Sequence, residues 1–220
     1  MIIPSIIAKT QKEFETRLNA VSFLDCVHID VMDGNFVKQT SFMFDVDFSV
    51  LHEFAYVEVH LMVENPLLYL EEHRDLFLKA TNIIVHCECD IEDVIAVARE
   101  YGKLVTLAIN PGTTYQKAID IARLYAITQV LVMTVHPGAY GSAFLPQMIA
   151  RVSRIAKQYS VICDGAMNER TILKVARSGA KHFVLGSVLQ NAADPQALAK
   201  ALLAQSMLNE PSKHIAKATI

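Results

Sequence analysis

Long apolar runs are missing from this chain of 220 residues, and so is any sign of a membrane-spanning segment. No stretch of 18 consecutive apolar residues occurs, although hydrophobic residues make up 52% of the sequence. The N-terminus lacks a basic region followed by an apolar stretch, so we expect no signal peptide and no membrane partner. The length and the apolar content predict one domain with one large core.

An excess of charge of either sign is also missing. The 20 Lys and Arg residues and the 23 Asp and Glu residues give a net charge of −3. Such a balance lacks the basic surface that nucleic-acid binding requires, so we expect no nucleic-acid partner. Cysteine is scarce and lies in or beside apolar runs, which favours reduced thiols in a cytoplasmic protein over a disulfide framework. The cysteines are Cys26, Cys87, Cys89 and Cys163.

No linker or internal repeat divides the chain; instead, short β-rich runs alternate with helical patterns. The strand candidates are residues 2–7, 26–31, 57–62, 83–87, 105–109, 130–135, 161–164 and 182–185. Because parallel strands need crossover connections, eight strand–helix units predict an α/β fold, a closed (β/α)8 TIM barrel. We assign the barrel to residues 1–205 and expect a polar C-terminal tail over residues 206–220.

Several segments carry signals for local structure. Thr10 and Glu13 have the spacing of a capping box, Asp90 is placed to open a second helix, and Asp194 precedes a first-turn proline. Residues 35–53 are the least regular part of the chain. Their spaced aromatic residues predict a loop and a short helix that pack over the mouth of the barrel.

Some strand candidates carry polar side chains on one face and aliphatic side chains on the other. Alternate residues of a strand share a face, so His28, Asp30 and Met32 point one way and the intervening aliphatic residues point the other way. His60 lies in a similar pattern, and Asp164 ends a later strand candidate. Functional residues of such barrels lie at the C-terminal ends of strands, so we expect these groups to converge.

A metal ion is the simplest reason for such a cluster. A single inward histidine is usually a satisfied core residue, but two carboxylates in an apolar barrel carry a desolvation cost that a divalent cation removes. We expect one divalent metal ion, bound by His28, Asp30, His60 and Asp164. Two nitrogens and two oxygens suit zinc, iron(II), manganese or cobalt and do not choose among them. His86 either lies behind this site or faces it.

Glycine-containing turns follow the last three strand candidates. Turns of this kind expose backbone amides that bind anions, and the loops after strands seven and eight of a barrel frequently hold phosphate. Taken singly, each turn is equally consistent with an ordinary tight turn. The candidate phosphate-binding residues are Gly138, Ala139, Tyr140, Gly141, Gly165, Ala166, Gly186 and Ser187.

From residue 4 to residue 187 the chain resembles the ribulose-phosphate 3-epimerases. The similarity is carried by residues 27–34, 59–63, 109–113, 130–135, 163–165 and 185–187. The resemblance implies a metal-dependent isomerase of the pentose phosphate pathway that interconverts D-ribulose 5-phosphate and D-xylulose 5-phosphate through an enediolate. By the same resemblance, Asp30 and Asp164 transfer the protons. The expected substrate contacts are Ser5, Met32, Met62, Met133 and His136.

The chain departs from the family in the loops that surround the substrate. His136 stands where the family usually has asparagine, and Ala166 stands where it usually has glycine. Ala166 can still offer its amide, provided that its φ is negative. The alternatives are a 3-epimerase of a hexulose phosphate such as D-allulose 6-phosphate, a barrel decarboxylase or aldolase, and a catalytically degenerate sugar-phosphate-binding barrel. In each case we expect a small ketose phosphate as partner, and a homo-oligomer.

Overall fold

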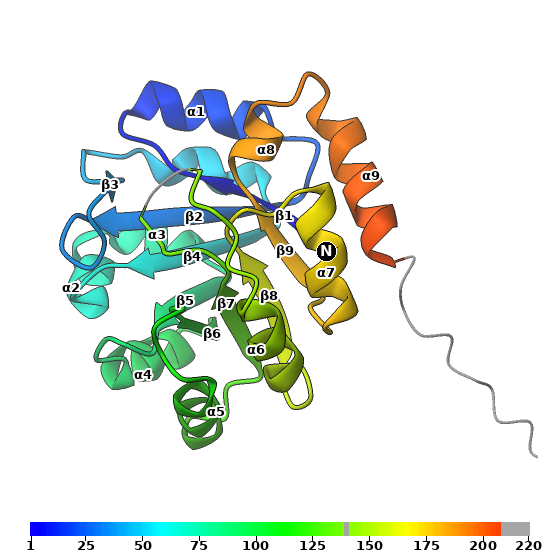
Figure 1. Ribbon diagram of the computed structural model, residues 1–220. Coiled ribbons are helices and arrows are strands. Elements are labelled where there is room, and N and C mark those ends of the chain that lie inside the picture. The colour runs from blue at the N-terminus through cyan, green and yellow to red at the C-terminus, as the bar shows by residue number, and fades with distance from the viewer. Residues whose placement is uncertain (139–140, 208–220) are drawn as a thin grey trace, which may run out of the picture.

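Eight parallel strands close into a barrel, as the sequence predicts (Figure 1). The computed structural model describes residues 1–138 and 141–207. The barrel strands are β1 (Ile2–Ile6), β2 (Cys26–Asp33), β4 (Tyr56–Met62), β5 (Asn82–His86), β6 (Leu104–Ile109), β7 (Gln129–Met133), β8 (Ser160–Asp164) and β9 (His182–Leu185). Strand β1 closes the ring by pairing in parallel with both β2 and β9. The short strand β3 (Thr40–Ser41) pairs antiparallel with β2 outside the ring.

Helices form a layer around the barrel (Figure 1). They are α1 (Gln11–Asn19), the 3-10 helix η1 (Phe48–Glu53), α2 (Pro66–Glu72), α3 (Arg74–Lys79), α4 (Glu92–Glu100), α5 (Tyr115–Leu124), α6 (Met148–Ile155), α7 (Glu169–Arg177), α8 (Ser187–Gln190) and α9 (Pro195–Met207). Within the described ranges, none of them has both the length and the apolar character needed to cross a bilayer. The predicted tail over residues 206–220 starts in the last turn of α9, and from residue 208 it lies outside the described residues.

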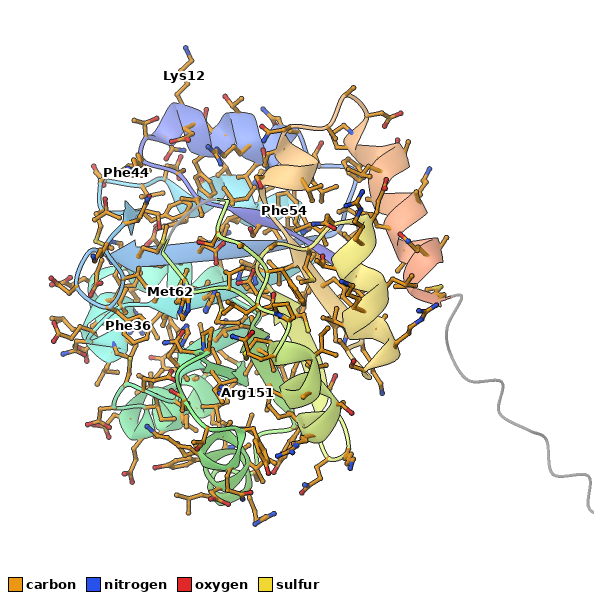
Figure 2. All side chains as sticks on the ribbon, viewed as in Figure 1. Lys12, Phe36, Phe44, Phe54, Met62 and Arg151 are labelled. Carbon is orange, nitrogen blue, oxygen red and sulfur yellow. The ribbon has the colours of Figure 1, made fainter. Side chains whose placement is uncertain are left out.

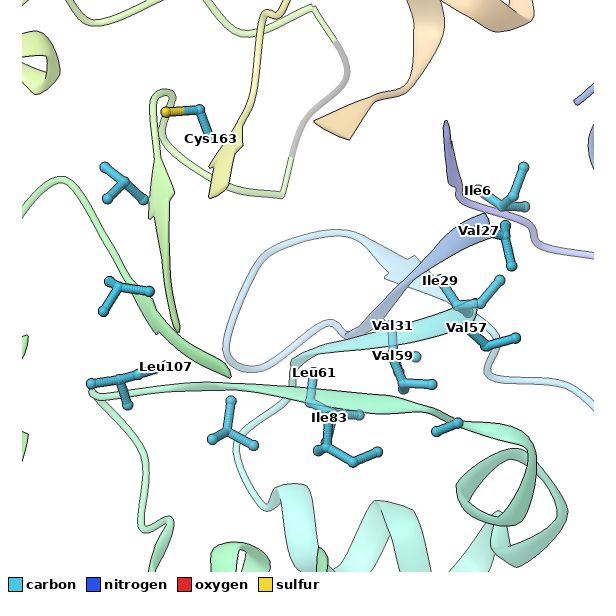
Figure 3. Packing of buried hydrophobic residues seen from close by; sticks show 14 of the residues in the cluster. Ile6, Val27, Ile29, Val31, Val57, Val59, Leu61, Ile83, Leu107 and Cys163 are labelled. Atoms are coloured by element: carbon cyan, nitrogen blue, oxygen red, sulfur yellow. The ribbon is translucent and has the colours of Figure 1, made fainter. Parts of the chain in front are cut away.

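The alternation read from the sequence separates the two faces of the barrel wall. Val27, Ile29 and Val31 of β2 are fully buried between the wall and the helices, beside aliphatic residues of β4 (Figure 3). Each buried side chain of this kind stabilises the fold by about 1.5–3 kcal/mol. The intervening residues of β2 therefore face the barrel interior, which is where the sequence places His28 and Asp30.

The two halves of the barrel interior differ in polarity. Residues of β5 to β9 and the chain just after β7 form an apolar cluster: Ile84, Ala108, Leu131, Met133, Val135, Ile162 and Val184. Strands β2 and β4 instead bury His28, Asp30, Glu58 and His60. Lys12 extends outward from α1, whereas Met62 lies toward the middle of the barrel (Figure 2). A polar site thus faces an apolar wall.

The predicted helix starts are partly correct. Thr10 caps α1 by accepting a hydrogen bond from the amide of Glu13, and the Asp194 carboxylate caps α9. The capping box is not closed, because the Glu13 carboxylate accepts the amide of Lys9 instead of that of Thr10. The helix predicted to open at residues 90–93 is present as α4, which begins at Glu92, but Asp90 does not cap it and no other described side chain does.

The prediction that residues 35–53 pack over the barrel mouth is correct only for their first part. Phe36 packs against the methionines at the mouth. Phe42 and Phe48 instead contact the ring of Phe14 on α1, with ring centroids 5.0 and 6.0 Å apart. These rings bury more apolar surface beneath a helix than they could over a polar cavity, so they join the outer core.

Candidate metal centre and active site

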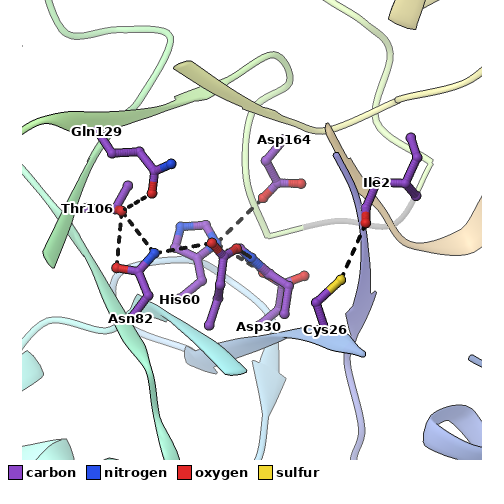
Figure 4. A network of polar contacts seen from close by, with 10 residues as sticks. Ile2, Cys26, Asp30, His60, Asn82, Thr106, Gln129 and Asp164 are labelled. Carbon is purple, nitrogen blue, oxygen red and sulfur yellow. Dashed lines mark hydrogen bonds and ion pairs between the residues drawn. The ribbon is translucent and has the colours of Figure 1, made fainter. Parts of the chain in front are cut away.

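Four buried side chains from three strands meet inside the barrel. His28 and Asp30 come from β2, His60 comes from β4, and Asp164 ends β8. One nitrogen or oxygen atom of each lies within 4.8 Å of those of the other three. Pairing of β2 with β4 places Asp30 beside His60, and Asp164 approaches from across the interior (Figure 4). The structure therefore brings together all four predicted ligands.

The distances in this cluster fit a shared metal ion. Asp30 Oδ1 lies 3.1 Å from His28 Nε2 and 3.0 Å from His60 Nδ1. His60 Nδ1 lies 3.5 Å from Asp164 Oδ2. Ligand atoms bonded tetrahedrally to zinc at about 2.0–2.1 Å lie about 3.3 Å from one another. The four groups thus have both the chemistry and the spacing of a divalent metal site.

The second ring nitrogen of each histidine is held from behind. His28 Nδ1 is 2.8 Å from Glu58 Oε2, and His60 Nε2 is 2.9 Å from His86 Nε2. A partner on one nitrogen leaves the other free to bind a metal, with the ring fixed in orientation. The sequence leaves His86 either facing the site or behind it. In the structure, His86 lies behind the site.

Electrostatics in the cluster favour a positive charge between the carboxylates. Although burial opposes it, Asp30 and Glu58 raise the pKa of His28 well above its usual value. Burial also opposes ionisation of Asp30, but His28 and His60 hold the pKa of this carboxyl well below its usual range. Burial lowers the pKa of His60 to about 4, which keeps that imidazole neutral, as a ligand must be. These properties fit a bound cation.

The two aspartates differ in their affinity for protons. Burial, with a further contribution from the charge of Asp30, raises the pKa of Asp164 to about 7. Two carboxylates whose environments separate their pKa values are suited to opposite roles in proton transfer. Asp164 can therefore carry a proton at neutral pH while Asp30 is ionised.

A cavity of about 680 Å³ lies over the cluster and includes Asp30 and Asp164 in its lining. Predicted substrate contacts that line it are Ser5, Met32, Met62 and Met133. His136 is exposed and does not line it, so its contact with a substrate stays a prediction.

The three predicted phosphate loops all reach this cavity. The candidates that line it are Gly138, Gly141, Gly165, Ala166, Gly186 and Ser187. Ala139 and Tyr140 lie outside the described residues. Among the described residues that line the cavity there is no lysine or arginine, so a bound anion would be held by neutral donors, among them backbone amides.

Two of these glycines leave no room for a side chain. Gly138 has a φ of +91°, and a Cβ there would lie 2.6 Å from the Cβ of Val37. Gly165 has a φ of +105°, and its Cβ would lie 2.4 Å from a methyl group of Val135. Glycine at residue 138 thus lets the loop after β7 pack closely on the segment that follows β2.

The sequence predicts that Ala166 offers its amide to a ligand only if its φ is negative. The structure does not meet this condition, because the φ of Ala166 is +53°. A residue with a Cβ carries a strain of about 1–2 kcal/mol in the left-handed region. The neighbouring Gly165 already turns the chain, so Ala166 must follow in a conformation that a second glycine would adopt freely.

We expect Ala166→Gly to raise the free energy of unfolding by about 1 kcal/mol, because relief of this strain exceeds the added entropy of the unfolded chain. Denaturant unfolding measures the change. Ala201→Gly, in the exposed middle of α9, is the matched control and should lower stability by about 1 kcal/mol. Equal losses in both variants would contradict the strained conformation of Ala166.

Two carboxylates that contact histidines of the site are absent from the sequence prediction. Glu58 contacts His28, and Glu88 contacts His86 with Oε2 3.2 Å from Nδ1. Glu58 shares a strand face with His60, and this alternation was a usable signal. Glu88 follows the end of β5, where strand alternation no longer fixes direction.

Comparison with known proteins gives consistent matches over the whole barrel. Residues 1–190 match the model of the ribulose-phosphate 3 epimerase family. Ribulose-phosphate 3-epimerase of Mycobacterium tuberculosis is 31% identical over 217 residues, which cover 94% of this chain and 93% of the relative. The cytoplasmic isoform of Oryza sativa subsp. japonica is 32% identical over 186 residues, or 81% of each chain.

Solved structures with other activities share the fold. A 3-keto-L-gulonate-6-phosphate decarboxylase from Vibrio cholerae has a TM-score of 0.69 at 18% identity, covering 96% of this chain and 99% of the other. A 3-hexulose-6-phosphate synthase from Salmonella typhimurium has a TM-score of 0.68 at 16% identity, covering 94% and 98%. At these identities the likeness shows the barrel alone.

Proposed function

The chain belongs to the ribulose-phosphate 3-epimerase family, and we propose on this ground that it is an isomerase that interconverts D-ribulose 5-phosphate and D-xylulose 5-phosphate. The observation that carries the proposal is that Asp30 and Asp164 line one cavity and cluster with His28 and His60. A barrel that only bound a sugar phosphate would have no need of two such carboxylates.

Inversion of the carbon next to a carbonyl requires one group to remove its proton and another to return a proton to the opposite face. Asp30 and Asp164 come from β2 and β8, which are separated around the barrel by β1 and β9. A sugar lying between them would present one face to each carboxyl. Asp30 would accept the proton from one face and Asp164 would return one to the other face, and the two carboxyls would exchange these roles in the reverse reaction.

One divalent ion would be held by the two histidines and the two aspartates. When bound, it polarises the sugar carbonyl and stabilises the negative charge that develops on oxygen as the proton leaves. His28 and His60 would supply the nitrogen donors, and Glu58 and His86 behind them would hold the two rings in orientation. Zinc, iron(II), manganese and cobalt all suit this donor set.

The apolar side of the cavity has a separate task. Met32, Met62 and Met133 line the cavity beside the aspartates and are nearly fully buried. Thioether side chains adapt to a flat intermediate and exclude water from it. Ser5 and the amides of the three glycine-containing loops would hold the hydroxyl and phosphate ends of the sugar.

A coupled assay with five-carbon and six-carbon ketose phosphates, each with and without a chelator, tests this function. We expect turnover of ribulose 5-phosphate that the chelator abolishes. A clear preference for D-allulose 6-phosphate would move the assignment to the hexulose alternative. Inertness toward every sugar, with metal bound, would indicate a degenerate barrel.

Location and assembly belong to the same proposal. We propose a cytoplasmic protein, supported by four free cysteines, of which three are buried. We also propose a homo-oligomer, for which the exposed Leu104 and Leu124 are interface candidates. Light scattering of the purified protein measures the assembly.

A further inference from the structure

A line of polar contacts runs from the predicted metal ligand His60 out to Glu88. His60 Nε2 lies 2.9 Å from His86 Nε2, and His86 Nδ1 lies 3.2 Å from Glu88 Oε2. His60 and His86 are fully buried, whereas the Glu88 side chain is 19% exposed. The line thus connects the interior of the barrel with the loop that follows β5.

Only one arrangement of protons lets His60 bind a metal through Nδ1. Its Nδ1 must then carry no proton. The ring proton is therefore on Nε2, and this N–H donates a hydrogen bond to His86. His86 can accept only on a bare Nε2, and its own proton must therefore be on Nδ1. A carboxylate accepts hydrogen bonds and donates none, so an ionised Glu88 is the partner that fixes this arrangement.

The surroundings of His86 and Glu88 hold both in place. The ring of His86 lies between Phe36 and His60, with centroid distances of 4.8 and 5.0 Å. The second oxygen of Glu88 accepts the backbone amide of Asn110 at 3.1 Å. Burial opposes ionisation of Glu88, but its hydrogen bonds, chiefly the one from His86, lower its pKa to about 2. The carboxylate is therefore charged at neutral pH.

We propose that His86 and Glu88 are positioning residues that fix the tautomer of His60 and thereby set the affinity of the site for its metal ion. This inference rests on the metal centre proposed above. His28 differs because Glu58 contacts it directly. The two histidines thus present opposite ring nitrogens to the site, and each nitrogen is selected by its own carboxylate.

Glu88→Gln tests the role of the carboxylate. The glutamine oxygen can still accept the amide of Asn110, but its NH2 group can donate to His86 and permit the wrong tautomer. Titration with Co²⁺ against a competing chelator should show an affinity about 10- to 100-fold lower than that of the wild type. Asp90→Asn, an exposed charge change in the same loop, is the control and should leave affinity unchanged.

Coupling through His86 separates positioning from a general loss of structure. His86→Phe keeps a ring between Phe36 and His60 but removes the connection to Glu88. We expect Glu88→Gln to have no further effect on Co²⁺ affinity in that background, because the two residues act in series. An equal effect of Glu88→Gln in both backgrounds would overturn the proposal, as would an unchanged affinity in the single variant.

The tautomers can also be read without any variant. In the zinc-loaded wild-type protein, ¹⁵N NMR of the imidazoles should find the proton of His60 on Nε2 and that of His86 on Nδ1. The reverse assignment would exclude the proposed role of His86 and Glu88 even if the His86 variant failed to fold. If the wild type bound no metal, the proposed metal centre would be rejected. If the wild type and Glu88→Gln bound metal equally, only the proposed role of Glu88 and His86 would be rejected.

Discussion

Asp164→Asn is expected to lower kcat for ribulose 5-phosphate epimerisation by about 10²- to 10⁴-fold while leaving binding of the sugar phosphate measurable. The amide keeps the shape of the side chain and an oxygen that can face the metal ion. It cannot donate or accept the transferred proton, which is the role that we propose for the Asp164 carboxyl in the cavity lining. Stopped assays of xylulose 5-phosphate formation measure the loss, and calorimetry measures binding.

The matched control is Asp120→Asn on the outer face of α5, where the side chain is 57% exposed. It should leave kcat unchanged. Hydrogen exchange at C3 in D2O adds a sharper test, since Asp30 alone should still exchange that hydrogen in one epimer and not in the other. Turnover of Asp164→Asn within tenfold of the wild type would contradict the scheme with two carboxyl groups.

Removal of the proposed metal ion is expected to reduce turnover to the background level. Without a cation, nothing polarises the sugar carbonyl, a contribution of several kcal/mol. We expect dialysis against a chelator to abolish the coupled assay and one equivalent of zinc, iron(II), manganese or cobalt to restore it. Mg²⁺ should restore far less, because two of the four donors are imidazoles and Mg²⁺ prefers oxygen.

The control for metal removal is the unfolding midpoint of the apoprotein. The midpoint should fall and return with the metal, since an ion that binds only the folded state stabilises it by mass action. Full activity in a protein shown to be free of metal would reject the proposed role of the ion.

The barrel and the meeting of His28, Asp30, His60 and Asp164 were predictable because a period of two residues is visible in a sequence. In β2, aliphatic residues alternate with His28 and Asp30, and only a wall with one face toward helices and one toward an interior site satisfies that pattern. The strand candidates consequently match the observed strands to within two residues. Convergence of Asp164 with the β2 residues then followed from closure of the ring.

Other features depend on contacts between loops, where no period exists. The contact of Glu88 with His86 requires a loop residue to fold back onto a strand histidine. Phe42 and Phe48 pack against helix α1 and not over the cavity. The conformation of Ala166 is set by the turn at Gly165. Each of these three features depends on tertiary contacts that the local sequence does not encode.

The activity likewise resides in the site and not in the barrel. Proteins with other activities share this fold at 16–18% identity. Function on such a fold is carried by a few side chains at the strand ends, which is why the tests above concentrate on them.

The proposed site holds one ion between four side chains from three strands. An anomalous-difference map from crystals of the Co²⁺-loaded protein would locate that ion. We predict a single strong peak about 2.0–2.2 Å from His28 Nε2, His60 Nδ1 and one oxygen each of Asp30 and Asp164. A peak at other residues, or none in crystals whose protein is shown to contain cobalt, would contradict the account.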